Sequence, residues 1–303
     1  MWRMDNSGHI SVLLKEVLEL LALEPDHIVV DATINGGGMS ELIAKNLGDR
    51  GHLIGIDMDN EALAFARERL AHSACRVTLK EGNNRNLDTF LEEEGIIHVD
   101  RFLFDLGLSS RQLDASGRGF AFMRDEPLLM TFRTSPGEED LSAERIINEW
   151  EEKHIADIIY GYGEERFARK IARQIVLARA ESPLRTTRQL VTVIEKAVPA
   201  WYRHKRKHFA TKTFQALRIT VNDEIQSLRE ALEKALRTLS PKGRILVITF
   251  HSIEDRIVKN TFKRFKETGV GDILTKKPVV PSKEEVRANP RSRSAKLRVF
   301  EHF

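Results

Sequence analysis

The segment IVVDATINGGGMS, residues Ile28–Ser40, joins an apolar run to three glycines, and it decides the predicted fold. Similar apolar runs follow at His52–Asp57, Cys75–Leu79 and Val99–Gly107, and segments with helical spacing separate them. Strand and helix alternate roughly every 25 residues, which is typical of a parallel sheet with crossover helices. Because these runs are apolar throughout rather than alternating, we expect both faces of the sheet to be buried. The predicted fold class is therefore α/β.

The alternation stops after the fourth predicted strand, and the next strand is predicted only at Arg244–Phe250. Apolar spacing predicts helices in between. One covers Glu164–Ala180, one begins after the capping-box pair Thr186 and Gln189, and one long helix covers residues 213–239. The predicted organisation is a core in two parts that an inserted helical domain interrupts, with the core at residues 1–112 and 213–303 and the insert at residues 113–212.

The composition of the 303 residues, with 41% hydrophobic and 31% charged side chains and a net charge of +3, is that of a soluble globular protein. No apolar run reaches the roughly 18 residues that a membrane-spanning helix needs. The charged pair Lys15 and Glu16 in the N-terminal apolar stretch does not suit a signal peptide. Cys75 is the single cysteine, so we expect a small buried side chain and no cysteine-based metal site. We expect a cytoplasmic protein without a bound metal.

Positive charge is distributed unevenly along the chain. The stretch Tyr202–Phe209, YRHKRKHF, places four Lys and Arg side chains among aromatic and histidine residues. Residues 276–298 form a second basic stretch, which three prolines stiffen, and we interpret it as a basic C-terminal tail. Two such stretches favour a polyanionic partner such as nucleic acid. The alternative is an ordinary solvated surface, which is the usual role of a single charge run.

The glycine turn after the first predicted strand is compatible with a ligand, because glycine lets the backbone approach a bound group closely. It is not a phosphate-binding P-loop, because no Gly-Lys-Ser/Thr follows. The spacing of NGGGMS also differs from the G-x-G-x-x-G pattern of dinucleotide-binding turns. A tight turn with a purely structural role is the alternative.

Three acidic residues distinguish these possibilities better. Asp31, Asp57 and Asp105 end the first, second and fourth predicted strands, so they should meet at the carboxyl edge of the sheet, where ligands bind. A carboxylate after the second strand can accept both hydroxyl groups of a ribose, and one after the first can face an ammonium group. This combination favours S-adenosylmethionine. The alternative for any single one of these acids is a helix N-cap.

Seven stretches occur here in the order known for one family: DATINGGGMS, GIDMDNEALAFARERL, DLGLSSRQLDASGRGFAF, GYGEERFARKIARQI, TFQALRITVNDEI, ITFHSIEDRIVK and NPRSRSAKLRVFE. From His9 to about Glu301 the chain resembles the ribosomal RNA small subunit methyltransferase H family, also called MraW. The resemblance implies a Rossmann-like, class I S-adenosylmethionine-dependent methyltransferase sheet with an inserted all-helical substrate-recognition domain. It also implies methylation of the N4 amino group of a cytidine in the decoding region of 16S rRNA, with the small ribosomal subunit as partner.

By position, the resemblance places cofactor contacts on Gly37, Gly38, Met39, Asp57, Asn84, Asp105 and Gln112. To these we add Asp31 from its place at a strand end. The chain departs from the family pattern at Met39, where a histidine is usual, at Asn84, where an aromatic residue is usual, and at Leu129 and Arg133, which replace acids. These departures indicate a divergent member or a paralogue. The alternative function is a non-catalytic RNA- or ribosome-binding paralogue that retains the fold.

Methyl transfer to an amine is an in-line displacement that depends mainly on alignment. Asp105, Ser109 and Ser110 follow the fourth strand, where amino-methyltransferases usually hold the target amine, and His251 follows the fifth. We predict that these four residues form the catalytic set, with Asp105 acting first as a cofactor contact. The alternative for His251 is the residue before a helix whose capping box starts at Ser252.

We predict that Arg and Lys residues of the insert and the tail hold RNA phosphates, which positions RNA without reading its sequence. The predicted RNA-binding residues are Arg166, Lys170, Arg173, Arg203, Lys205, Arg206, Lys207, Arg291, Arg293 and Lys296.

Overall fold

The computed structural model describes residues 11–137 and 139–303, so His9, where the resemblance begins, lies outside the described residues. The chain divides into two compact units. Unit 1 comprises Met1–Ser109, as far as it is described, together with Ile225–Phe303, and unit 2 comprises Ser110–Glu224. None of the helices in the described ranges combines the length and the apolar character that crossing a membrane requires.

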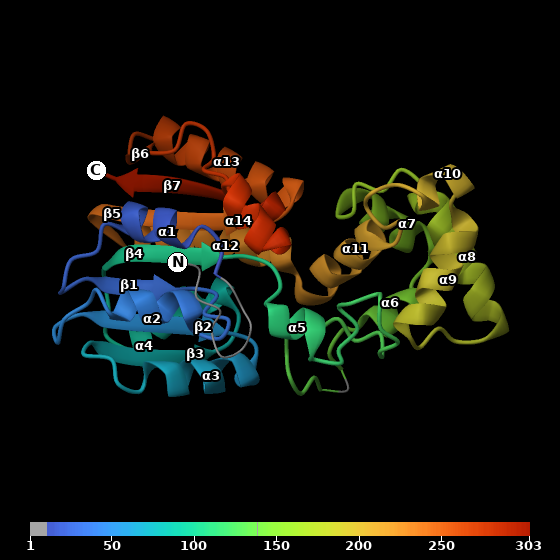
Figure 1. Ribbon diagram of the computed structural model, residues 1–303, viewed down its shortest axis with the longest axis horizontal. Coiled ribbons are helices and arrows are strands. Elements are labelled where there is room, and N and C mark those ends of the chain that lie inside the picture. Colours follow the sequence, from blue (N-terminus) through green and yellow to red (C-terminus); the bar gives the residue numbers. More distant parts are fainter. Residues whose placement is uncertain (1–10, 138) are drawn as a thin grey trace. The chain divides into compact units, whose positions relative to one another are not determined.

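Unit 1 is built around a seven-stranded sheet in the order β3-β2-β1-β4-β5-β7-β6 (Figure 1). The first five strands pair in parallel, and β7 runs antiparallel to both of its neighbours. The strands are β1 (Ile28–Asp31), β2 (His52–Asp57), β3 (Arg76–Glu81), β4 (Val99–Asp105), β5 (Leu239–Thr249), β6 (Gly271–Ile273) and β7 (Lys296–His302). All five predicted strands are present, and the predicted fold class is confirmed.

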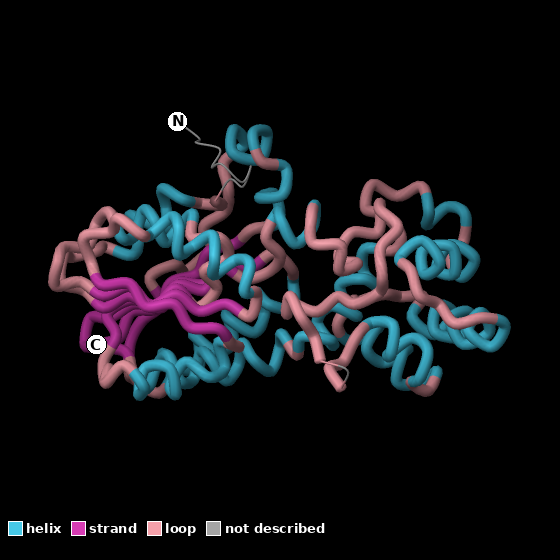
Figure 2. The backbone as a smooth tube through the Cα atoms, turned by 90° about the horizontal axis from the view of Figure 1, so that it is seen from below, coloured by secondary structure: helices cyan, strands magenta, loops and turns pink. Residues whose placement is uncertain are grey.

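Helices cover both faces of this sheet (Figure 2). Neighbouring residues of a strand point to opposite faces of the sheet. Val29 therefore packs against one set of helices and Val30 against a second set on the other face, and both residues are fully buried. The first set is α1 (Leu14–Leu21), α2 (Gly38–Ala44) and α3 (Asn60–Leu70), and the second is α4 (Leu87–Glu93), α12 (Glu224–Arg237) and α13 (Ser252–Glu267). The short elements η1 (Asn84–Asn86), α14 (Lys283–Ala288) and η2 (Pro290–Ser294) complete the unit. Cys75 is buried in the core, as predicted.

Unit 2 is helical. Its helices are α5 (Ser110–Asp114), α6 (Ala143–Glu149), α7 (Glu152–Gly161), α8 (Ala168–Glu181), α9 (Thr187–Ala197), α10 (Ala200–Arg203) and α11 (Thr211–Asn222). The apolar stripe of α8, with Ile171 and Ile175 fully buried, packs between α7 and α9. The predicted capping box is confirmed, because the Thr186 side chain accepts from the backbone of Gln189 and the Gln189 side chain accepts in return.

The single helix predicted over residues 213–239 is wrong. Asp223, with a φ of 47°, ends α11, and α12 begins at the next residue. The side chain of Asn222 then ties the end of α11 into unit 2. It donates to the carbonyl of Met130 (2.8 Å) and accepts from the backbone of Phe132 (2.8 Å). For this reason unit 2 extends to residue 224, where the predicted insert ended at 212.

The predicted basic tail is wrong for its last part, because residues 296–302 form strand β7 inside the sheet. Leu297, Val299 and Phe300 are fully buried. Two of the basic residues that suggested a tail are paired within unit 1, because Lys296 and Arg298 both bind Asp255 of α13, each at 2.7 Å. A strand that carries two paired cations therefore has the appearance of a charged tail in the sequence.

Candidate functional site

The turn between β1 and α2 requires glycine at one position. Gly37 has a φ of 76°, and a Cβ added there would lie 3.1 Å from the Cα of Ala66 in α3 and 3.2 Å from its Cβ. Asn35 also has a positive φ, and its side chain donates to the carbonyl of Thr33 at 3.0 Å. Gly38 is the first residue of α2. The close approach to α3 therefore fixes the path of the turn over the carboxyl edge of the sheet.

Asp31 ends β1 and is 1% exposed. Its Oδ2 accepts from the hydroxyl of Ser40 at 2.6 Å, and its Oδ1 accepts from the backbone of Thr33 at 3.3 Å. Burial raises the pKa of this carboxyl to about 6, although both hydrogen bonds oppose the shift. Asp31 is thus not the N-cap of α2, because that position belongs to Gly37.

Asp57 ends β2 and joins two turns. Its Oδ2 accepts from the backbone of Asn35 and its Oδ1 from the backbone of Asp59, both at 2.9 Å. Each oxygen keeps a further lone pair, so the carboxylate can still accept two hydroxyl groups. Burial, with the charges of Asp59 and Asp31, raises its pKa to about 7. The N-cap of α3 is Asp59, so the capping alternative does not apply to Asp57 either.

Asp105 ends β4 and is the least satisfied of the three acids. Its backbone donates to the hydroxyl of Thr33 at 2.6 Å, but its Oδ1 is buried and has no hydrogen-bond partner among residues 11–137 and 139–303. Burial raises its pKa to about 8, and the charges of Asp31 and Glu254 add to the shift. The three carboxyls therefore share one desolvated edge of the sheet, and a cation bound there would favour their ionised forms.

Asn84 and Met39 depart from the family pattern, and each follows a parallel strand: Asn84 comes after β3 and Met39 after β1. Asn84 begins η1 after β3, and its Oδ1, like that of Asp105, is buried and has no partner among the residues that the structure describes. The side chain of Met39 is 5% exposed and packs in the core beneath α2. Any contact from residue 39 to a ligand is thus left to its backbone. At position 84 the structure offers an acceptor where the family pattern has an aromatic ring.

These residues fit S-adenosylmethionine. Leaving a buried acceptor unpaired costs about 1–3 kcal/mol, so Asp105 and Asn84 both favour a ligand that brings hydrogen-bond donors. The cofactor carries an ammonium group, two ribose hydroxyls and an adenine amino group, together with a positively charged sulfur. A nearby set of raised-pKa carboxyls suits that positive charge.

His251 is the N-cap of α13, and the predicted capping box starting at Ser252 is wrong by one residue. The Nδ1 of His251 accepts from the backbone of Glu254 at 3.3 Å, and Glu254 accepts in return from the backbone of His251 at 3.2 Å. Because Nδ1 accepts, the neutral ring carries its proton on Nε2. That nitrogen is buried and has no hydrogen-bond partner in the part of the chain that the structure describes, although it lies 3.1 Å from an oxygen of Glu254. His251 can thus donate to a substrate.

Three further predicted residues follow β4. Ser109 is the last residue of unit 1 before the insert, while Ser110 is the first residue of α5 in unit 2. Gln112, also in α5, is 6% exposed, and its carbonyl accepts from the hydroxyl of Ser116 at 2.7 Å. The catalytic role of the serines and the cofactor contact of Gln112 stay predictions.

The predicted RNA-binding residues of unit 2 gather around aromatic rings. Arg166 lies over the rings of Phe167 and Trp201, with distances of 5.2 and 5.5 Å to their centroids. Lys170 lies 5.9 Å from the centroid of Phe167, and Lys205 lies 4.9 Å from that of Trp201. We did not predict Trp201, although it directly precedes the basic stretch in the sequence. Of the other predicted residues here, Arg203 pairs with Glu195 at 3.1 Å, and the exposed ones are Arg173, Arg206 and Lys207.

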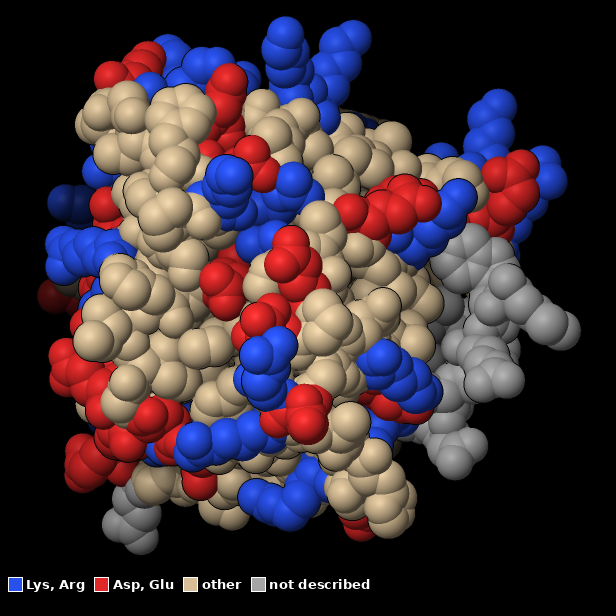
Figure 3. Space-filling view, turned by 90° about the vertical axis from the view of Figure 1, so that its left-hand side faces the viewer, with Lys and Arg blue, Asp and Glu red and all other residues tan. Residues whose placement is uncertain are grey.

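Charged residues on unit 1 are arranged differently. The face where the parallel strands begin shows both signs of charge interspersed among uncharged residues (Figure 3).

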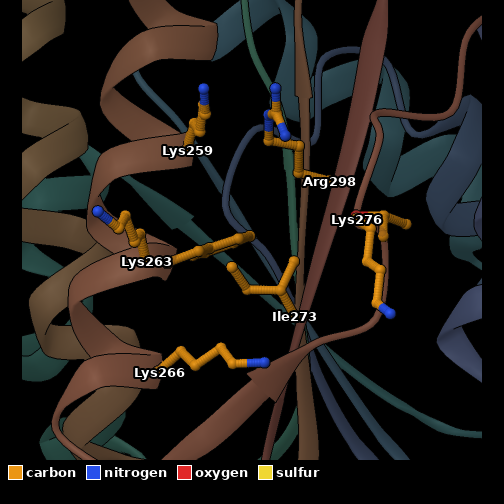
Figure 4. Close-up of a pocket in the computed structure, with 8 residues that line it drawn as sticks. Lys259, Lys263, Lys266, Ile273, Lys276 and Arg298 are labelled. Carbon is orange, nitrogen blue, oxygen red and sulfur yellow. The ribbon is translucent and has the colours of Figure 1, made fainter.

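A pocket of about 260 Å³ lies between α13, β6 and β7, and Lys259 and Arg298 stand on opposite sides of it (Figure 4). Lys266 reaches across it to pair with Asp272 at 2.5 Å. The three acids described above do not line this pocket. In η2, the predicted residues Arg291 and Arg293 are exposed.

The comparison with known families is decisive. The sequence pattern of the MraW methylase family matches residues 6–303. The chain belongs to the MraW methylase family. Similar proteins named "Ribosomal RNA small subunit methyltransferase H" include one from Brevibacillus brevis, 46% identical over 97% of both chains. Another, from Clostridium botulinum (strain Kyoto / Type A2), is 47% identical over 96% of this chain and 97% of the relative.

Solved structures give a more distant likeness to this MraW family member. An rRNA methylase from Streptococcus thermophilus aligns over 96% of this chain and 93% of its own, with 13% identity and a TM-score of 0.45. The N-methyltransferase NodS from Bradyrhizobium japonicum WM9, in complex with S-adenosyl-L-homocysteine, aligns over 95% and 85%, with 8% identity and a TM-score of 0.42. We draw no conclusion from likeness at this level.

Proposed function

We propose that this MraW family member transfers a methyl group from S-adenosylmethionine to the N4 amino group of a cytidine in the decoding region of 16S rRNA. Family membership and the names of relatives at 46% and 47% identity support a ribosomal RNA small subunit substrate. The motifs of the resemblance support the base and the atom. A cytoplasmic location belongs to the same proposal, because the substrate is part of the ribosome.

The observation that carries the proposal is the buried, unpartnered oxygen of Asp105 at the carboxyl edge of the sheet. It lies at the end of the strand beside β1, which leads into the glycine turn, and its pKa is raised to about 8. A structural acid in a binding-inert turn would have its acceptors satisfied by the protein. We infer that a bound ligand supplies the missing donors and positive charge.

We assign a different role in the reaction to each of the side chains at the site. Bound S-adenosylmethionine supplies a methyl group on a positively charged sulfur, and transfer breaks that C–S bond as the new C–N bond forms. We assign Asp57 to the ribose hydroxyls, and Asp31 and Asp105 to the positive charge of the cofactor. We assign the Nε2–H of His251 to a hydrogen bond with the substrate base. After transfer the nitrogen is positively charged and releases one proton, and water is a sufficient acceptor because the protonated amine is a strong acid.

Two measurements test this proposal. Calorimetry with S-adenosylmethionine should show one binding site per chain. Small ribosomal subunits from a strain that lacks the gene should then gain labelled methyl groups, and mass spectrometry of the nucleosides should find N4-methylated cytidine. Absence of cofactor binding would favour the non-catalytic paralogue. Binding with methylation of another nucleoside would retain the enzyme and remove the assigned base.

A further inference from the structure

The half-exposed Trp201 in unit 2 is part of a compact group of aromatic rings and cations that the reaction itself does not use. We call this group the Trp201 cluster, which consists of Arg166, Phe167, Lys170, Trp201, Tyr202 and Lys205. Its three rings meet edge to face in pairs. The centroids of Phe167 and Tyr202 are 5.0 Å apart, and those of Trp201 and Tyr202 are 5.7 Å apart. This is a packed arrangement and not a set of loose surface side chains.

The buried side chain of Glu165 holds Tyr202 and Phe167 in place. Tyr202 is 8% exposed, and its hydroxyl donates to Glu165, which is fully buried. The other oxygen of Glu165 accepts from the backbone of Phe167 at 2.9 Å. One buried carboxylate therefore orients two of the three rings. Trp201, in contrast, leaves 52% of its surface exposed. A rigid support with one open indole is the form expected of a stacking platform.

Positive charge surrounds the open ring. Arg166 and Lys205 lie 5.5 and 4.9 Å from its centroid, on chain segments before and after the cluster core. Three more basic residues lie within the YRHKRKHF stretch, namely Arg203, which pairs with Glu195, and Arg206 and Lys207. Cation–π contacts by themselves contribute about 0.5–1 kcal/mol at an exposed site. They do not require so large an excess of charge, which points to a polyanion.

We propose that Trp201 is a stacking platform for an unpaired nucleobase of the RNA substrate, while Arg166 and Lys205 bind the adjoining phosphates. The proposal rests on the proposed function, since that function makes RNA the substrate. Proteins that bind single-stranded nucleic acid combine a cationic groove with aromatic rings on which bases stack. A protein partner would favour an apolar surround. Duplex RNA would leave the indole unused, because its bases are stacked within the helix.

The full-length protein is to be titrated with a short single-stranded RNA and with the same RNA annealed to its complement, while tryptophan fluorescence is recorded. The chain has three tryptophans, so Trp201→Phe and Trp150→Phe separate their signals. We expect the single strand to quench the wild type and Trp150→Phe, and not Trp201→Phe. Trp201→Ala should weaken single-strand affinity by about tenfold. Because no charge is removed, the dependence of affinity on salt should keep its slope.

The matched control is Tyr160→Ala, which removes another aromatic side chain of unit 2 that is 70% exposed and has no cation recorded over its ring in the described structure. We expect it to bind RNA as the wild type does. Equal affinity of Trp201→Ala and Tyr160→Ala, or equal quenching by duplex and single strand, would overturn the proposal. Cofactor calorimetry on the same variants distinguishes this from failure of the proposed function. If the single strand does not quench the wild type while cofactor binding and methyl transfer are intact, the stacking platform is wrong and the proposed function still stands.

Discussion

The charged residues at the carboxyl edge of the sheet in unit 1 and in the Trp201 cluster of unit 2 differ in sign and in exposure. At the sheet edge, Asp31 is buried and Asp57 and Asp105 are partly buried, and one oxygen of Asp105 has no partner among the described residues, so the protein alone does not stabilise the ionised acids well. In the cluster, the cations are exposed and lie over rings, so they are stable without any ligand. In our proposals the first arrangement binds one small, cationic ligand. The second binds a polyanion without selecting its sequence.

The largest expected effect is at the sheet edge. Asp57→Ala removes the acceptor that we assign to both ribose hydroxyls, and a hydrogen bond to a charged group contributes about 1.5–3 kcal/mol. We expect cofactor affinity measured by calorimetry to fall at least 100-fold, with RNA affinity unaffected. The cofactor affinity of Asp57→Asn, which keeps one acceptor oxygen, should lie between those of the wild type and Asp57→Ala. A loss below threefold in Asp57→Ala would remove Asp57 from the site.

Gly37→Ala tests whether the turn is built for close approach. The left-handed conformation costs a non-glycine residue about 1–2 kcal/mol, and the new methyl group would press on Ala66. We expect the free energy of unfolding to fall by about 2 kcal/mol and cofactor affinity to fall with it. Gly36→Ala is the matched control, because a Cβ there meets only the Cβ of Phe65 at 4.0 Å. If the two variants unfold at the same denaturant concentration, the turn is not constrained in this way.

The raised pKa values at the sheet edge predict a dependence on pH. Folding raises the pKa of Asp31, Asp57 and Asp105 to about 6, 7 and 8, so the folded state holds protons that the unfolded state has lost. Stability without cofactor should therefore be greatest near pH 4 and fall as the pH rises through 6 to 8. Cofactor affinity should rise severalfold from pH 6 to 7.5, because the ionised carboxyls bind the cation. Melting temperatures with and without cofactor across this range would show both trends, and a flat affinity profile would contradict the assignment of the acids.

The smallest effects are expected from single exposed cations. Arg206→Ala should lower the slope of log affinity for RNA against log salt by about 0.7, as one phosphate contact is lost. Arg203→Ala should do less, because Arg203 already shares its charge with Glu195. Lys259→Ala, in the pocket of unit 1, is the control of equal charge. If all three variants shift RNA binding alike, the YRHKRKHF stretch has no special role and general surface charge explains the binding.

Local signals in the sequence were sufficient for the five parallel strands, the glycine turn and the three acids, because continuous apolar runs and strand-end residues report directly on a buried parallel sheet. They were insufficient where long-range contacts decide. The break at Asp223 follows a good helical pattern, and β7 alternates cations with apolar residues that only Asp255 makes tolerable in the core. The partners Thr33 and Ser40, which set the geometry of Asp105 and Asp31, carry no signal of their own in a single sequence. Trp201 directly precedes the basic stretch, and only packing distinguishes it from a surface residue.

The position of β7 between β5 and β6 affects how the nascent chain folds during translation. Unit 2 is contiguous and can fold once residue 224 has left the ribosomal tunnel, whereas the sheet waits for residues 296–302. At usual rates of translation this delay is on the order of 10 s. During that time β5, with its apolar core residues, has an open hydrogen-bonding edge that favours association with other chains. Yield of active enzyme in cells should thus depend on chaperones that shield this edge.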